Sequence, residues 1–232
     1  RPALRRLRQE IVYETGVSSM IDPLNLILGL VVAGLVPFIA VVATSFIKIS
    51  IVLLLVRNAL GVQQIPPNMV LNALAVIISG YIMAPVIVET FNILVAGNYS
   101  FDNIAAVQEA YSAAKVPLIS WLQLHADQRE LTFFVQAAEK IWPPELLSYA
   151  TQDNLAIILP AFVVSQLREA FEIGFLLYLP FIAIDLIVSN ILLAMGMMMV
   201  SPMTISLPFK LFLFVMVDGW SRLILGLIMT YV

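Results

Sequence analysis

Long stretches of this chain carry no formally charged residue. There is none between Asp22 and Lys48, and that interval exceeds the ~20 residues that an α-helix needs to cross a bilayer. Apolar residues make up 61% of the chain and charged residues 12%, against about half and about a quarter in a soluble domain. A bilayer or a large subunit interface must cover this surplus. The sequence therefore predicts an all-α integral membrane protein that builds oligomers. The later apolar runs are 49–56, 69–88, 155–167, 173–200, 203–217 and 223–232.

Polar stretches between these runs divide the chain into four parts. Residues 1–19 form a polar, arginine-rich tail, which we keep out of the fold prediction because the following Met20 is a candidate native start. Residues 20–96 form a first helical hairpin, whose turn is the Pro-Pro stretch 61–68. Residues 97–153 form a polar amphipathic insertion, and residues 154–232 form C-terminal helical hairpins. The insertion carries more acid than base, which favours the extracytoplasmic side. The arginines of the tail favour the opposite topology, so the number and direction of the spans stay open.

The insertion contains one helix with clear signals. Asp127 followed by Glu130 resembles a capping-box start, and Trp142 with the two prolines after it is a stop signal. The apolar face needs a covering surface, most simply that of a neighbouring subunit or of the wall of a larger surrounding assembly. Its residues recur at helical spacing, at Leu131, Phe134, Val135, Ala138 and Ile141.

Most of the apolar runs contain a proline. Each proline removes a backbone hydrogen bond, and in a membrane the neighbouring helices or water must satisfy the freed carbonyl. Several of them together indicate a mutually supporting bundle of bent helices. They are Pro37, Pro85, Pro160, Pro180 and Pro208.

Four charged residues lie inside or beside apolar runs, namely Lys48, Asp185, Lys210 and Asp218. A charge at the centre of a lone span costs roughly 2.5–3.5 kcal/mol on insertion scales. We therefore expect these side chains to be buried against protein, in interhelical or intersubunit pairs. Snorkelling near helix ends and ion or proton translocation are the alternatives.

A methionine cluster precedes a Ser-Pro turn. Met195, Met197, Met198 and Met199 surround Gly196, and Ser201-Pro202 follows. Methionine is unbranched and adapts to varied contacts. In a symmetric ring, this loop would form a deformable apolar constriction that seals and then yields to a passing chain. Ordinary packing in a core is the alternative.

No catalytic or metal-binding constellation is found. The chain has no cysteine, and His125 is its one histidine. Glu169 and Glu172 lie three residues apart and would form either an acid pair or, as we favour, a salt-bridge patch with Arg168. No glycine pattern matches a phosphate loop, and no basic stripe points to nucleic acid. We expect no enzymatic activity, no cofactor and no metal.

Two ordered stretches resemble the SctR/FliP family of type III secretion export apparatus proteins. They are PFIAVVATSFIKISIVLLLVRNALGVQQIPPNMVLNALAVIISGYIMAPV (37–86) and SQLREAFEIGFLLYLPFIAIDLIVSNILLAMGMMMVSPMTISLPFKLFLFVMVDGW (165–220). The turn LGVQQIPPN is more similar to the virulence injectisome SctR than to flagellar FliP. The resemblance covers most of residues 24–232.

The resemblance implies a function. Family members form a pentamer that assembles with SctS and SctT into a helical export gate, beside an SctU-like switch protein. The gate lies in the bacterial inner membrane within the basal body and projects in part to the periplasmic side. Unfolded substrates pass through it toward the inner rod, and the family's methionine gasket falls on Met197, Met198 and Met199. A flagellar-type gate subunit, a small secondary transporter and an intramembrane enzyme are the alternatives.

Overall fold

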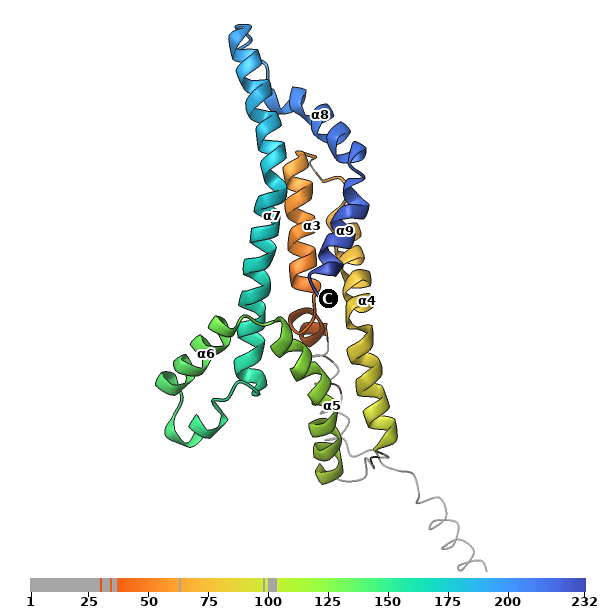
Figure 1. Ribbon diagram of the computed structural model, residues 1–232, viewed down its shortest axis with the longest axis vertical. Coiled ribbons are helices and arrows are strands. Elements are labelled where there is room, and N and C mark those ends of the chain that lie inside the picture. The colour runs from red at the N-terminus through yellow and green to blue at the C-terminus, as the bar shows by residue number, and fades with distance from the viewer. Residues whose placement is uncertain (1–29, 31–33, 35–36, 63, 98, 100–103) are drawn as a thin grey trace, which may run out of the picture. The chain divides into compact units, whose positions relative to one another are not determined.

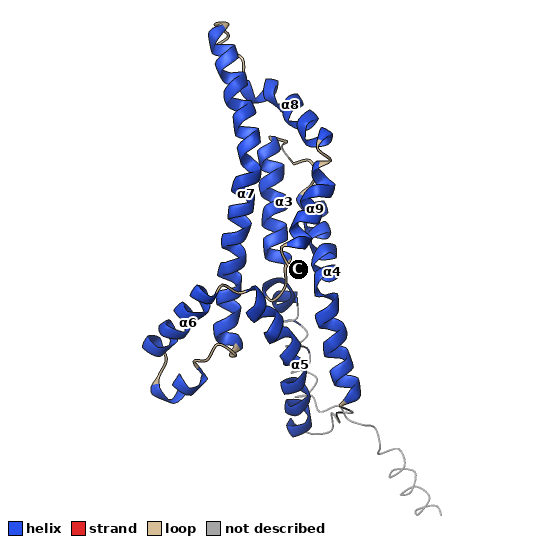
Figure 2. Cartoon of the chain, viewed as in Figure 1, coloured by secondary structure: helices blue, strands red, loops and turns tan. Residues whose placement is uncertain are grey.

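The computed structural model describes residues 30, 34, 37–62, 64–97, 99 and 104–232. These residues form helices and loops, with no β-strand among them (Figure 2). The chain falls into two units, residues 1–40 and 41–232, and every element below belongs to the second. The beginning of the predicted first hairpin, residues 20–36 apart from Leu30 and Gly34, lies outside the described residues.

The first hairpin consists of α3 (Phe46–Leu60) and α4 (Asn68–Ala96), which pack against each other. The predicted turn between them is confirmed. Gly61 ends α3 in the left-handed conformation, with φ at 75°, and its N–H donates to the Asn58 carbonyl at 3.0 Å. A glycine adopts this conformation without steric cost. Arg57 Nη1 then donates to the Pro66 carbonyl at 3.2 Å and fastens the turn to α3.

The insertion folds as α5 (Ile104–His125), α6 (Gln128–Ile141) and the short 3₁₀ helix η1 (Pro144–Tyr149). The predicted start and stop of α6 are confirmed, but the capping box is wrong. The Asp127 carboxylate accepts a hydrogen bond from the N–H of Arg129, and the N–H of Asp127 donates to Ser165 Oγ, each at 2.8 Å. Asp127 is therefore a simple N-cap that also ties α6 to the helix carrying Ser165.

That helix is α7 (Leu155–Ala194), and it covers the apolar face of α6. Leu131 and Phe134 of α6 belong to one apolar cluster with Phe162 of α7. The expectation that a neighbouring subunit covers this face is wrong for these two residues. Ile141 does remain outside the cluster, because 77% of its surface is exposed.

The charged patch at 168–172 does not interrupt the helix. Helix α7 has 40 residues and runs unbroken through this patch. At 1.5 Å per residue the helix is about 60 Å long, which is twice the ~30 Å hydrocarbon thickness of a bilayer. Figure 1 shows α7 beside α3, with α5 and α6 near its first turns and α8 at its far end. The apolar runs 155–167 and 173–200 therefore belong, up to Ala194, to one helix.

The chain continues as α8 (Pro202–Met216) and α9 (Gly219–Met229), which meet at 61°. Asp218 at this bend has a φ of 52°. By length and hydropathy, α4 and α7 are each able to cross a membrane, and α8 with α9 makes a third candidate if the bent pair counts as one span. The all-α membrane fold class predicted from composition is confirmed.

Two apolar clusters lie along α7. The larger one joins α3, α4, α8 and α9 to the part of α7 from Ala170 onward. The smaller one joins Ala43, α5 and α6 to residues 158–162 of α7. Between them on α7 lie Ser165, Gln166 and Glu169, and the first two are fully buried. We use the term polar layer for these three side chains together with the groups that they contact.

Candidate functional site

The loop of residues 195–201, the methionine loop, connects α7 to α8. The N–H of Gly196 donates to the Leu193 carbonyl at 3.0 Å, and the N–H of Met197 donates to the Leu192 carbonyl at 2.9 Å. Together with the φ of 73° at Gly196, these bonds form a Schellman cap that ends α7 and turns the chain outward. Pro202 then starts α8 in the first helical position, where its missing N–H costs nothing.

The methionine side chains project from this loop into open space. Met198 is 81% exposed and Met199 is fully exposed, while Met195 and Met197 are exposed to a smaller extent. None of the four belongs to either apolar cluster of the chain. Core packing within the chain does not explain the cluster.

An ion pair joins the two helices that carry the methionine loop. Lys210 Nζ on α8 donates to Asp185 Oδ2 on α7 at 2.6 Å and to the Ala59 carbonyl of α3 at 3.2 Å. Ser206 Oγ donates to the other carboxylate oxygen at 2.5 Å. Lys210 is 3% exposed, whereas the Asp185 side chain is 32% exposed. Charged residues from the interiors of two separate apolar runs are thus brought together.

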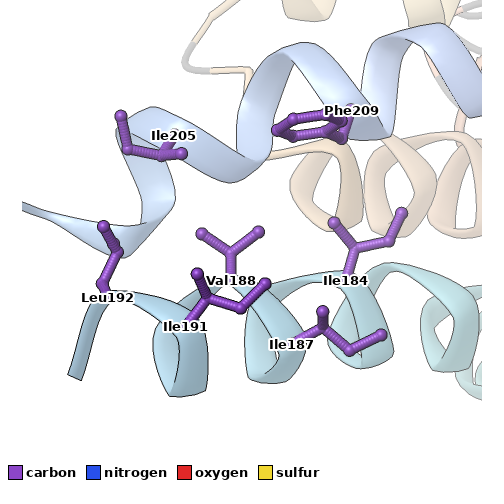
Figure 3. Close-up of a pocket in the computed structure, with 7 residues that line it drawn as sticks. All are labelled: Ile184, Ile187, Val188, Ile191, Leu192, Ile205 and Phe209. Atoms are coloured by element: carbon purple, nitrogen blue, oxygen red, sulfur yellow. The ribbon is translucent and has the colours of Figure 1, made fainter. Parts of the chain in front are cut away.

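An apolar groove of about 390 Å³ lies between this ion pair and the methionine loop. Only hydrocarbon side chains line it, five from α7 and two from α8 (Figure 3). The α8 side chains Ile205 and Phe209 face the row on α7 across the groove. The facing sides of the two helices are therefore apolar along this stretch. The α7 residues are Ile184, Ile187, Val188, Ile191 and Leu192.

A second ion pair lies in the polar layer. Lys48 Nζ on α3 is 2.8 Å from Glu169 Oε2 on α7, and the lysine is almost fully buried. The same Nζ lies 3.7 Å from the centroid of the Tyr231 ring. Both predicted intramembrane lysines thus meet a carboxylate of α7 within the chain.

Arg168 and Glu172 do not join Glu169 in a surface patch. The Arg168 guanidinium pairs instead with the Asp127 carboxylate of the insertion. The backbone N–H of Arg129 and, second to it, the Arg168 guanidinium hold the pKa of Asp127 below its usual range. Glu172 is exposed and forms no ion pair with any residue that the structure describes. The expectation of a local salt-bridge patch on α7 is therefore wrong.

Asp218 differs from the other three predicted charges. Its side chain is exposed, accepts a hydrogen bond from Ser221 Oγ at 3.0 Å and has no cation partner within the described part of the chain. The expectation that Asp218 is buried against protein is therefore wrong within the single chain.

His125 Nδ1 contacts the Trp121 carbonyl at 2.8 Å. Among the described residues, no group of histidine and carboxylate side chains is arranged to hold a metal ion.

Sequence reasoning missed three residues that complete these contacts. Ser206 lies four residues before Lys210, so helical spacing alone would have pointed to a shared partner. Gln166 and Tyr231 carry no comparable signal, because they are joined across 65 residues of sequence.

The sequence of the chain is similar to those of known proteins. The sequence profile of the FliP family matches residues 29–227. The chain is 54% identical to the Yop proteins translocation protein R of Yersinia pestis, over 90% of this chain and 97% of the relative. It is 47% identical to the hypersensitivity response secretion protein HrcR of Ralstonia nicotianae, over 89% and 96%. It is 44% identical to the virulence protein YscR of Salmonella typhimurium, over 90% and 97%. The chain therefore belongs to the FliP family, within the SctR/FliP group of type III secretion export apparatus proteins.

Proposed function

We propose that this protein is a core subunit of a type III secretion export gate. In this proposal several copies, five by analogy with the family, assemble with SctS-like and SctT-like subunits into a pore for unfolded proteins. The observation that carries the proposal is the exposed methionine loop, which is held on a capped helix end above a buried ion pair. The names of the relatives, which describe secretion and translocation, support the same direction.

Exposed apolar side chains support assembly with other subunits. Phe175 and Leu186 of α7 and Phe212 of α8 are each more than half exposed in the single chain. Helix α7 is also about twice as long as a bilayer is thick, so lipid alone does not cover it. Neighbouring copies, the other gate subunits and the surrounding basal body are the covering surfaces that this proposal requires.

The methionine loop suits a gasket for a physical reason. A thioether side chain has three soft torsions, so it closes on a neighbour or on a variable polypeptide at little strain. The backbone of the loop is held by the Schellman cap at Gly196, and the Asp185–Lys210 pair joins the two helices that carry the loop. Flexible side chains on a fixed backbone give a seal that opens and recloses without rebuilding the helices.

Alanine at Met197, Met198 and Met199 together tests the gasket. Because this change removes side-chain bulk but no backbone hydrogen bond, we expect complexes that assemble at wild-type yield and leak ions across the membrane. Secretion should fall less than the barrier does. A matched control replaces three exposed methionines on helices, Met203, Met216 and Met229, and should not leak. Poor complex yield without leakage in the first variant would refute the gasket.

We also propose that the insertion lies on the periplasmic side of the inner membrane. Its excess of acid over base supports this side. The chain has no cysteine, so one placed at the exposed Ile141 reports its location without background. A membrane-impermeant thiol reagent should modify it from the periplasm in intact cells. Modification only after access to the cytoplasm would refute the side assignment.

A further inference from the structure

Tyr231, in the segment directly after α9, connects the two apolar clusters of the chain. Its ring stacks on Trp121 of α5, with 5.9 Å between the ring centroids and 12° between the ring planes. Trp121 in turn packs against Phe162 of the smaller cluster, with 5.3 Å between the ring centroids. Helix α9, which this segment follows, packs in the larger cluster through its buried residues Leu223 and Leu227. A single aromatic ring therefore spans the polar layer.

Polar contacts fix the orientation of this ring. The Tyr231 hydroxyl donates to Gln166 Oε1, and Gln166 Nε2 donates to the His125 carbonyl at the last residue of α5, 3.1 Å away. Lys48 Nζ lies over the ring face while it pairs with Glu169. One side chain thus contacts α3, α5 and α7, and each of its polar contacts is with a group that also bonds elsewhere in the polar layer.

The insertion is joined to the rest of the chain both by apolar packing and by the polar layer. Each intact hydrogen bond of such a layer adds only about 0.5–1.5 kcal/mol of net stability, because folding exchanges it for a hydrogen bond with water. Beyond the polar layer, α5 and α6 are held to α7 by the smaller cluster, by the pair of Arg168 with Asp127 and by the hydrogen bond from the Asp127 N–H to Ser165 Oγ, and α5 also packs against α4. Segments held in this way open locally without global unfolding.

We propose that Tyr231 is a latch that holds the helical insertion, α5 and α6, against α7. Its removal allows the insertion to open as a unit while the bundle of α3, α4, α7, α8 and α9 stays folded. The latch is independent of the gate function proposed above, because it concerns no residue of the methionine loop.

Two single-cysteine reporters separate this opening from general unfolding. Ala138 of α6 and Ala75 of α4 are both buried, and a cysteine adds only one sulfur at each site. In the full-length protein in detergent, we expect Tyr231→Leu to raise the thiol-labelling rate at position 138 about tenfold, as loss of an aromatic and cation–π contact predicts. The rate at position 75 should stay unchanged. Tyr231→Phe, which removes only the hydroxyl, should have a smaller effect.

The matched control is Tyr149→Leu, which removes an exposed tyrosine ring from the insertion itself and should change neither rate. Two results would overturn the latch. One is an unchanged rate at position 138 in Tyr231→Leu. The other is an equal increase at both reporters, which would make Tyr231 a general stability residue of the whole chain.

Discussion

Replacing Asp185 with alanine tests how much the two helices that carry the methionine loop, α7 and α8, depend on the Asp185–Lys210 ion pair. The substitution removes the only carboxylate within salt-bridge distance of Lys210 among the described residues. The Lys210 ammonium, which is 3% exposed, would keep the Ala59 carbonyl at 3.2 Å as its acceptor. Ser206 Oγ would also lose its 2.5 Å bond and keep only the weaker contact to the Met203 carbonyl at 3.3 Å.

Removing one partner of a buried ion pair costs about 3–5 kcal/mol, because the other charge stays desolvated. A third of the Asp185 side chain is exposed, so solvent already screens part of the pair and the lower end of that range applies. We expect Asp185→Ala to lose about 3 kcal/mol of stability, which is on the order of a 100-fold change in an equilibrium constant. Asp185→Asn, which keeps a hydrogen-bond acceptor in reach, should lose less.

The decisive comparison is with the double variant Asp185→Leu with Lys210→Met. Exchange of a whole buried pair for apolar side chains of similar size is often neutral. The double variant should therefore be more stable than Asp185→Ala, although it carries one more substitution. The measurements are the thermal unfolding midpoint in detergent and the yield of extracted complex. An Asp185→Ala variant as stable as the wild type, or a double variant as damaged as the single one, would refute the reasoning.

Two further predictions concern single residues. Gly196 has φ at 73°, and no neighbouring atom lies within 4 Å of the position that a Cβ would take there, so Gly196→Ala should cost about 1 kcal/mol through backbone strain alone. Gly80→Ala in the interior of α4, which is equally uncrowded, should stabilise instead, and thermal midpoints check both. The lowered pKa of Asp127 gives stability above its ordinary value of 3.8 that is lost as pH falls further. The unfolding midpoint of the wild type should approach that of Asp127→Asn below pH 3.8, and a constant difference between them would contradict this.

Local sequence signals predicted local structure well. The helical spacing of 131–141 and the cap at Asp127 identified α6, and the glycine among the methionines placed a loop where α7 ends. These features depend on backbone conformation within a few residues, which the residue types there determine directly. The same reasoning identified Lys48, Asp185 and Lys210 as charges that need partners, because burial of an unpaired charge is costly wherever it occurs.

The partners themselves were beyond sequence reasoning. Lys48 meets Glu169 across 121 residues of sequence, and no periodicity connects the two. Arg168 stood beside two glutamates in the sequence and instead bonds to Asp127 across the fold. Neighbours in a helix three or four residues apart are always available as apparent partners. Which of them is used depends on which other helix lies against that face, and this is a property of packing.

Helix α7 shows why hydropathy alone misjudges such a chain. The helix is apolar enough to pass as a membrane span. Its longest uncharged stretches, however, are the 13 residues before Arg168 and the 12 residues between Glu172 and Asp185, each about 20 Å at the helical rise. Neither covers the ~30 Å of hydrocarbon that a lone span must cross. The two carboxylates Glu169 and Asp185 are instead neutralised by lysines of α3 and α8 within the chain. Pairing inside the fold thus leaves an outward face rich in exposed apolar side chains, and it is this pairing that makes a 40-residue helix compatible with a membrane-embedded protein.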